Sequence, residues 1–292
     1  MIRAISVRNA SKFFLHGLLT RKKTMRVIII TGSSDGIGAE MARQLAKAEG
    51  ANLALVLAAR NKESLEQVAA ECARHGAQTL VVQTDVSVQE QCKHLIAATV
   101  QKFGRIDALV NNAGRSAHAL FEDVLDLAWY EELMRINLWG SVWCTHAALP
   151  YLKQSRGSIV AVSSLAGLIG VPGRTAYNAT KFAMAGFFEG LRAELKGAGV
   201  SVTTAYPGVV ATQIRYRGFN AAGTALGSSS LKEDKAMSVE ECAGLIIDGM
   251  NRRKREVVMS FKGKLGRFMK LIAPGLVEDM ALAALKDDVR PH

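Results

Sequence analysis

The sequence predicts an α/β fold built on a single, doubly wound parallel sheet that is flanked by helices on both faces. From residue 25 onward, short runs rich in Val, Ile and Leu alternate with longer segments of helical period. The runs show little alternation of apolar and polar residues, which is typical of strands covered on both faces. A glycine-rich turn directly follows the first run. Together these observations indicate repeated strand–helix–strand units with right-handed crossovers.

The expected strands span residues 26–31, 52–59, 78–84, 106–111, 157–163, 200–206 and 256–260. Amphipathic stretches between them predict helices, for example over 37–48, 62–75, 88–103 and 176–196. Residues 213–237 break the pattern and are expected to form a mobile substrate loop. That loop ends at Ser238, which predicts a helix N-cap with Glu241 three residues later.

Length and composition exclude several classes of protein. The 292 residues suit one large α/β domain, and the 49% hydrophobic content supports a sizeable core. This balance excludes a disordered, collagen-like or disulfide-stapled chain. No apolar run reaches the roughly 18 residues that cross a bilayer. The four cysteines are scattered, which predicts inert thiols in a reducing compartment, and no metal site is expected.

The net charge of +11 is concentrated at the two ends of the chain. Residues 1–24 hold six basic residues and no acid, and residues 25–251 are neutral. Residues 252–270 hold eight basic residues and one acid, and residues 271–292 hold two basic residues and four acids. A neutral body argues against binding of nucleic acid. Residues 262–272 alternate basic side chains with Leu265, Phe268, Met269 and Ile272. They predict either peripheral contact with an anionic membrane or packing on the substrate loop or a partner subunit.

The basic N-terminal extension, residues 1–24, allows two interpretations. Its lack of acids resembles a mitochondrial transit peptide more than a secretory signal. Alternatively, translation starts at Met25 and the first 24 residues are disordered or never made. The expected localisation is cytoplasmic with peripheral membrane association, or mitochondrial if the extension is a genuine transit peptide.

The run TGSSDGIG at residues 31–38 links the first strand to the first helix. Glycines there let the backbone approach a pyrophosphate, whose charge meets free N–H groups at the helix N-terminus. Arg60 follows the second strand, where a cation favours the 2′-phosphate of NADP(H) over NAD(H). Asp35 in the turn opposes that preference, so NAD(H) is not excluded.

Tyr177 and Lys181 are four residues apart in a helical segment, so both project from one face. An ammonium beside a phenol stabilises phenolate, which allows proton exchange near neutral pH. Ser163 and Ser164 end the fifth strand at the carboxyl edge of the sheet, where open α/β folds bind ligands. A serine hydroxyl there can hold an oxygen of the substrate beside the tyrosine, so these residue types in this pattern predict proton exchange with that oxygen.

Several motifs occur in one order: NNAG at 111–114, INLWG at 136–140, the serine pair, the Tyr/Lys pair and YPG at 206–208. This combination resembles the short-chain dehydrogenase/reductase family over about residues 25–260. The resemblance implies a Rossmann-type oxidoreductase domain, followed by a basic amphipathic tail over 261–292. The stretch 147–183 is similar to the hydroxysteroid dehydrogenase branch, which implies a bulky apolar ketone or alcohol as substrate.

In that family the catalytic serine lies thirteen residues before the tyrosine, which selects Ser164. The resemblance implies that Tyr177 is the general acid/base, that Ser164 orients the carbonyl, and that Asn137 holds a relay water. Lys181 would tune Tyr177 and bind the nicotinamide ribose. Implied cofactor contacts are Gly32, Ser33, Ser34, Asp35 and Ile37 at the pyrophosphate and adenosine end, Asp85 and Val86 at adenine, Asn112 at the midsection, and Val210 and Thr212 at the nicotinamide amide.

The predicted function is therefore NADP(H)-dependent interconversion of a ketone and a secondary alcohol by hydride transfer, in a homodimer or homotetramer. Two alternatives remain open. The substrate could be a 3-oxoacyl thioester on an acidic carrier protein, which a basic patch would attract. Outside the enzymes, the chain could be a cofactor-bound sensor or scaffold that docks through its basic tail.

Overall fold

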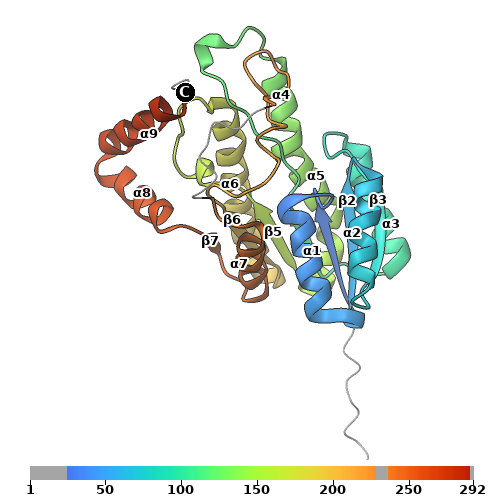
Figure 1. The fold of residues 1–292 in the computed structure, drawn as a ribbon. Helices are drawn as coiled ribbons and strands as arrows, with labels where there is room; N and C mark the ends of the chain where they lie inside the picture. Colours follow the sequence, from blue (N-terminus) through green and yellow to red (C-terminus); the bar gives the residue numbers. More distant parts are fainter. Residues whose placement is uncertain (1–24, 228–235, 290–292) are drawn as a thin grey trace, which may run out of the picture.

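A computed structural model describes residues 25–227 and 236–289. Its centre is a seven-stranded sheet, all parallel, with the strand order β3-β2-β1-β4-β5-β6-β7 (Figure 1). The strands are β1 Arg26–Thr31, β2 Leu53–Ala59, β3 Gln78–Gln83, β4 Ala108–Asn111, β5 Ser158–Val162, β6 Ser201–Tyr206 and β7 Glu256–Val258. The predicted fold class is confirmed, and each expected strand is present with ends that differ by at most two residues.

The helices are α1 Gly36–Glu49, α2 Lys62–Ala73, α3 Gln89–Phe103, α4 Ala128–Met134, α5 Gly140–Ser155, α6 Thr175–Leu195, α7 Val239–Asn251, α8 Phe261–Ile272 and α9 Pro274–Val289. Short 3-10 turns occupy η1 Gly50–Asn52, η2 Phe121–Asp123, η4 Leu165–Gly167 and η5 Lys196–Ala198, and η3 Arg135–Trp139 is a π-helical turn. Ser238 caps α7 as predicted, because its Oγ accepts a hydrogen bond from the Glu241 N–H at 3.0 Å.

Two hydrophobic layers hold the helices against the sheet (Figure 1). Ile28 and Ile30 of β1 face α1, α2 and α7, whereas Val27 and Ile29 face α3, α5 and α6. Alternate residues of a strand point to opposite faces, so a strand covered on both sides is apolar throughout. All four β1 residues are fully buried, which explains the unbroken apolar run in the sequence.

The parallel arrangement brings the carboxyl ends of β1, β4, β5 and β6 to one edge of the sheet. The loops after these strands carry the glycine turn, the NNAG motif, the serine pair and the YPG motif. A third apolar cluster near this edge joins Trp129 and Leu133 of α4 with Tyr177 of α6 and Phe219. This cluster fixes the start of α6 beside the loops.

The C-terminal tail forms two helices, α8 and α9, where the sequence predicted one amphipathic segment. Lys270 donates a hydrogen bond to the Leu168 carbonyl at 3.1 Å, and Arg267 pairs with Glu256 at 2.5 Å. Of the four basic side chains in residues 262–272, which are Lys262, Lys264, Arg267 and Lys270, the last two are therefore bound to the body of the protein. Within the described residues, no helix is both long and apolar enough to cross a bilayer.

Two expectations fall partly or wholly outside the described residues. The predicted substrate loop is irregular over 213–227, with turns and isolated bridges, while 228–235 lie outside the description. The N-terminal extension, residues 1–24, also lies outside it. The four cysteines are buried and free, as expected for inert thiols.

Candidate active site

The turn between β1 and α1 is shaped by glycine. Gly32 has φ +65°, and a Cβ built there would lie 2.7 Å from Ala113 Cα, so a side chain has no room. Asp35 caps α1, since its Oδ1 accepts a hydrogen bond from the Gly36 N–H at 2.7 Å. Ser33 is fully buried, and its Oγ accepts from the Ala58 N–H at 3.0 Å. The Ser33 side chain therefore braces the turn.

A groove of about 650 Å³ runs along this turn and the ends of β2, β3 and β4. Of the residues expected to contact a cofactor, it is lined by Gly32, Ser34, Asp35, Ile37, Arg60, Asp85, Val86, Asn112 and Thr212. Asn112 donates through Nδ2 to the Thr31 and Gly32 carbonyls, at 3.0 Å each, and so holds the turn against β4. A glycine-floored turn at a helix N-terminus fits the pyrophosphate of a dinucleotide.

Three arginines line the groove: Arg60, Arg115 and Arg217. Burial lowers the pKa of the Arg115 guanidinium, Glu132 raises it, and the nearby Arg60 lowers it. Arg115 and Arg217 were not predicted as site residues. Arg115 directly follows the NNAG motif, a signal that could have found it, whereas Arg217 lies in irregular chain with no pattern. The cluster gives the groove the charge that a phosphate ester needs.

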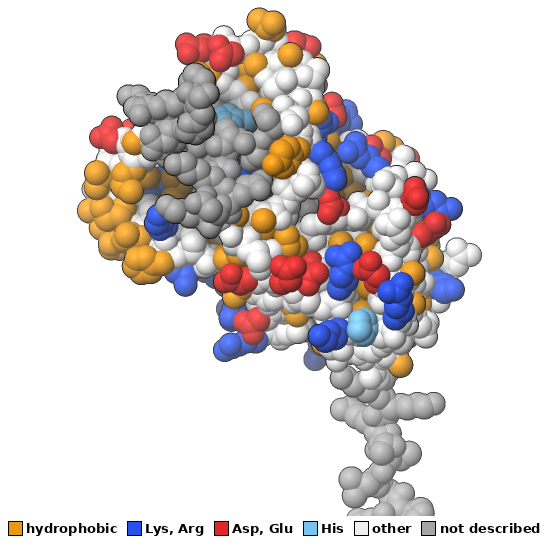
Figure 2. All heavy atoms as spheres, in the orientation of Figure 1, with side chains coloured by type: hydrophobic (Ala, Val, Ile, Leu, Met, Phe, Trp, Pro, Cys, Tyr) orange, Lys and Arg blue, Asp and Glu red, His pale blue; other side chains and the backbone are white. Residues whose placement is uncertain are grey.

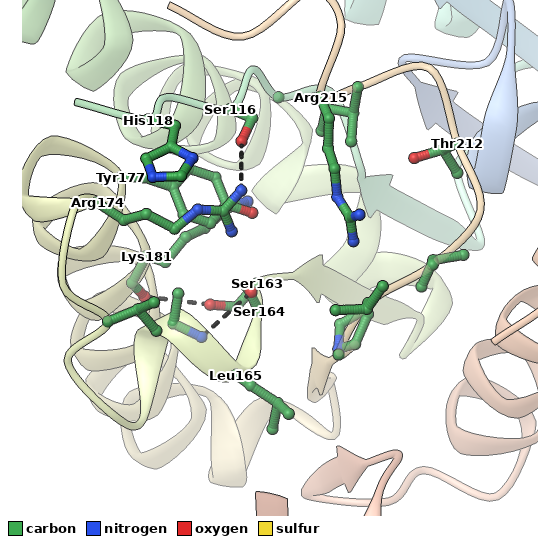
Figure 3. Close-up of a pocket in the computed structure, with 18 of the residues that line it drawn as sticks. Ser116, His118, Ser163, Ser164, Leu165, Arg174, Tyr177, Lys181, Thr212 and Arg215 are labelled. Atoms are coloured by element: carbon green, nitrogen blue, oxygen red, sulfur yellow. Dashed lines mark hydrogen bonds between the residues drawn. The ribbon is translucent and has the colours of Figure 1, made fainter. Parts of the chain in front are cut away.

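A second cavity of about 340 Å³ adjoins the groove, and the two share Ile37, Asn112, Gly114, Thr212 and Ile214 in their walls. Ser164, Tyr177 and Lys181 line this cavity (Figure 3). Val210 also belongs to its wall. The fold thus brings together four predicted residues from the loops after β5 and β6 and from α6. Among the described residues, none forms a hydrogen bond with the Tyr177 hydroxyl, so that group faces the cavity without a protein partner.

Lys181 lies one helical turn after Tyr177 and is 3% exposed. Its Nζ donates to the Val162 carbonyl at 3.0 Å and lies 5.7 Å from the centroid of the Tyr177 ring. Burial lowers the pKa of Lys181, and the neighbouring Tyr177 opposes that effect. The ammonium is therefore held close to the phenol by one backbone hydrogen bond.

The two serines after β5 have different surroundings. The Ser163 hydroxyl donates to the Lys181 carbonyl at 3.1 Å, which ties β5 to α6. The Ser164 Oγ accepts from the Ala166 N–H at 3.2 Å, and the hydroxyl proton stays available for a group in the cavity. Both serines line the cavity, and of the two only Ser163 donates its hydroxyl proton to another described residue.

Asn137 occupies the π-helical turn η3 and is fully buried. Its Oδ1 accepts from the Arg115 N–H at 2.8 Å, and its Nδ2 donates to the Arg115 carbonyl at 2.9 Å and to Thr180 Oγ1 at 3.0 Å. Both amide protons are thus used within the protein. The side chain lines neither cavity and links the loop after β4 to α6.

Other residues of this second cavity, which is called the catalytic cavity below, were not predicted from the sequence. His118, Arg174 and Arg215 contribute polar walls, and Ala281 and Leu285 of α9 close one side. These residues come from irregular segments and from the chain terminus, where no periodic signal marks a site. Among the described residues, no group of three or more His, Cys, Asp or Glu side chains is placed to hold a metal ion.

This architecture defines a class of protein: dinucleotide-dependent oxidoreductases that act on CH–OH or C=O groups. A family model described as short chain dehydrogenase matches residues 26–221, about two thirds of the sequence. The chain belongs to the short-chain dehydrogenase family.

Known relatives agree with this assignment. The 11-beta-hydroxysteroid dehydrogenase 1A of Arabidopsis thaliana is 37% identical over 260 residues, covering 87% of this chain and 73% of the relative. A Dictyostelium discoideum dehydrogenase/reductase SDR family protein 7-like is 33% identical, with coverages of 87% and 79%. An alcohol dehydrogenase of Thermococcus sibiricus, solved with 5-hydroxy-NADP, matches with a TM-score of 0.68 and 26% identity, covering 80% of this chain and 94% of that one.

Proposed function

We propose that the protein interconverts a bulky apolar ketone and the corresponding secondary alcohol with NADP(H). The observation that carries the proposal is that Ser164, Tyr177 and Lys181 line one cavity, and that this cavity adjoins the dinucleotide groove. A ketone in the cavity would then meet a hydroxyl donor, an acid/base and a nicotinamide at once. Related proteins named hydroxysteroid dehydrogenases support this type of substrate.

Each residue has a defined part in the proposed reaction. The bound nicotinamide supplies or accepts the hydride. Ser164 donates its hydroxyl proton as a hydrogen bond to the substrate oxygen and so orients the carbonyl. Tyr177 delivers a proton to that oxygen during reduction and removes it during oxidation. Lys181, held by the Val162 carbonyl, stabilises the phenolate that remains.

The preference for NADP(H) over NAD(H) is supported by charge. Arg60, Arg115 and Arg217 line the groove, and Arg217 neutralises the one carboxylate at the turn by pairing with Asp35 at 2.9 Å. A 2′-phosphate placed among them would form charge-assisted hydrogen bonds. Asp35, which opposed this preference in the sequence, is therefore compensated.

The test uses trans-1-decalone as a bulky ketone and follows NADPH oxidation. Tyr177→Phe should abolish turnover, because Phe has no proton to transfer, and should leave NADPH binding measurable by fluorescence. Tyr151→Phe, on α5 and outside both cavities, is the matched control and should turn over normally. Turnover retained in Tyr177→Phe refutes the mechanism. An acetoacetyl thioester in the same assay tests the alternative substrate. Faster NADPH oxidation with the thioester than with trans-1-decalone would favour a 3-oxoacyl thioester as the substrate over a free ketone.

We further propose that α8 and α9 contact an anionic membrane surface. Figure 2 shows hydrophobic side chains gathered over this part of the surface. They include Phe261, Phe268, Leu271, Ile272 and Met280, each at least 58% exposed. Such a patch marks an interaction site, and Lys262 and Lys264 beside it are exposed and form no ion pair among the described residues. Basic side chains bordering an apolar face suit anionic head groups.

Sedimentation with liposomes tests this contact. The protein should pellet with vesicles that contain phosphatidylglycerol and stay in solution with phosphatidylcholine alone. Binding should be lost in Phe268→Ser/Leu271→Ser and weakened in Lys262→Gln/Lys264→Gln. Leu125→Ser, at a 91% exposed position elsewhere, is the control. Equal pelleting of all variants contradicts the proposal. If the wild-type protein is a dimer that dissociates in Phe268→Ser/Leu271→Ser, the apolar face of α8 and α9 is instead an interface with a second copy of the chain.

A further inference from the structure

One stretch of chain, residues 212–217, forms part of the wall of both the dinucleotide groove and the catalytic cavity. Thr212 and Ile214 line both of them. Arg215 lines the catalytic cavity (Figure 3), and Arg217 lines the groove. The stretch consists of bends and turns, without a helix or strand to fix it. A displacement of these residues therefore changes both sites at once.

Arg115, in the loop after β4, holds the end of this stretch. Its Nε donates a hydrogen bond to the Arg217 carbonyl at 2.8 Å. Its guanidinium carbon lies 3.5 Å from the centroid of the Phe219 ring, which is a cation–π contact. Phe219 is 2% exposed and packs in the apolar cluster that contains Tyr177. One side chain therefore binds residues 217 and 219 and joins them to the loop after β4.

The backbone of Arg115 is itself tied to the catalytic helix. Its N–H donates to Asn137 Oδ1 at 2.8 Å, and its carbonyl accepts from Asn137 Nδ2 at 2.9 Å. The same Nδ2 donates to Thr180 Oγ1 of α6 at 3.0 Å. The Arg115 side chain thus extends from a backbone that cannot shift without breaking these hydrogen bonds.

Arg115 also lines the dinucleotide groove, near Arg60. Burial lowers the pKa of its guanidinium despite the Glu132 carboxylate 3.4 Å from Nη1, and Arg60 lowers it further. A phosphate in the groove would neutralise this pair of cations. The contacts to Arg217 and Glu132 use Nε and Nη1, and Nη2 carries two further N–H donors. Arg115 can therefore bind a phosphate and keep its hold on residue 217.

We infer that Arg115 is a positioning residue that couples the two sites: a cofactor phosphate bound to its guanidinium fixes residues 212–219 and so shapes the catalytic cavity for the substrate. This inference rests on the proposed function, because the dinucleotide and the ketone are the two ligands that it links. A ligand that fixes a side chain removes freedom that the second ligand would otherwise have to remove. Each ligand should therefore bind more tightly when the other is present.

Hydrogen exchange tests the coupling without turnover. The Phe219 N–H donates to the Ser116 carbonyl at 3.0 Å, and the Gly227 N–H donates to the Tyr216 carbonyl at 3.0 Å. Exchange of these amides reports how firmly the chain around them is held. Saturating NADP+ should slow exchange in peptides that cover residues 213–227 by at least about fivefold. Equal exchange with and without NADP+ in the wild-type protein overturns the inference.

Variants show whether Arg115 carries the effect. In Arg115→Gln the slowing by saturating NADP+ should fall to about twofold or less, and Arg115→Lys should keep part of it because the charge remains. Arg60→Gln is the matched control: it alters the same groove at a residue with no printed contact to residues 212–219 in the described chain, and should show the full slowing. Equal slowing in wild type and Arg115→Gln contradicts the role of Arg115.

Circular dichroism shows whether Arg115→Gln folds. If it does not, Phe219→Leu replaces it, because leucine keeps the residue apolar and removes the ring beneath the guanidinium. The slowing by NADP+ should then also fall to about twofold or less. A full slowing in Phe219→Leu together with a full slowing in Arg115→Lys would overturn the inference.

Kinetics with trans-1-decalone separate this inference from the proposed function. At saturating NADPH, Arg115→Gln should raise the KM for the ketone at least about fivefold and change kcat less than about twofold, since the acid/base is untouched. Lys102→Gln, an exposed cation of α3 that lines neither site, is the control. If no ketone is reduced at all, the proposed function fails while the exchange result stands. If the ketone is reduced with an unchanged KM in Arg115→Gln, the coupling fails while the proposed function stands.

Discussion

Arg217 and Asp35 form an ion pair with a 2.9 Å contact, although they are 182 residues apart in sequence. Asp35 caps α1 at the phosphate turn, and Arg217 belongs to the irregular segment whose Ile214 and Arg215 line the catalytic cavity. The ion pair therefore joins the turn of the cofactor groove to the segment that lines the catalytic cavity. It also neutralises a carboxylate at the turn that would otherwise repel the phosphates of a cofactor.

Asp35→Asn should increase the affinity for NADPH. Asparagine keeps the helix cap and removes the negative charge, which frees Arg217 for the cofactor. The gain should be about two- to fivefold, the range of an exposed ion pair, and should shrink at high salt. Fluorescence titration measures it. An equal gain for NADH would show that the 2′-phosphate is not involved.

Arg60→Gln should weaken NADPH binding by about tenfold or more, because a charge-assisted hydrogen bond to the 2′-phosphate is lost. NADH lacks that phosphate, so its affinity should change less than about twofold. Lys62→Gln, an exposed cation two residues later that does not line the groove, is the matched control. A parallel loss for both cofactors would remove Arg60 from the specificity site.

Replacing Lys181 should change how stability depends on pH. Burial lowers the pKa of Lys181 below its ordinary value near 10.5, so the folded protein binds fewer protons than the unfolded chain in that interval. Wild-type stability therefore gains a contribution as pH rises toward 10.5, and Lys181→Met lacks it. The free energy of unfolding of wild type minus that of Lys181→Met should therefore increase between pH 7 and pH 10. The increase should be about 1.4 kcal/mol for each tenfold difference in the proton affinity of Lys181 between the unfolded and the folded state. Urea denaturation across that range measures the change, and a constant difference would contradict the prediction.

The cysteines should resist alkylation in the native protein. Burial raises the pKa of Cys72 to about 11 and that of Cys242 to about 12, and Cys92 and Cys144 are also buried. Only the thiolate reacts, so iodoacetamide at pH 8 should label none of the four until urea unfolds the chain. Intact mass spectrometry counts the adducts, and fast labelling of Cys72 in the folded state would show that the site opens locally.

Two glycines should respond in opposite ways to alanine. Gly32→Ala places a Cβ 2.7 Å from Ala113 Cα at φ +65°, and should destabilise the protein by ~2 kcal/mol or more and abolish NADPH binding. Gly186→Ala, in the middle of α6 with no atom within 4 Å of the new Cβ, should stabilise it by about 0.5–1 kcal/mol. Thermal unfolding separates the two. An unchanged stability in Gly32→Ala would show that the turn can rearrange to accept the added Cβ.

Much of the fold could be predicted because its signals are local. The apolar runs of β1, β2 and β5 correspond to strands that are almost fully buried on both faces. The spacing of Tyr177 and Lys181 follows directly from helical geometry, and the structure places both in one cavity wall. The second C-terminal helix, α9, escaped prediction. Its apolar face is weakly defined, and its contact with the cavity through Leu285 exists only in the folded chain.

By itself, the sequence determined the parallel sheet, the glycine turn and the placement of Tyr177, Lys181 and Ser164 at the carboxyl edge, because strand periodicity, turn chemistry and helical spacing act between near neighbours. The tertiary structure alone decided that Arg217 pairs with Asp35. It also decided that the Asn137 amide forms hydrogen bonds with Arg115 and Thr180, and that Arg174 and Arg215 line the same cavity. Charged side chains on loops carry no periodicity. Their partners are fixed only when distant segments pack together.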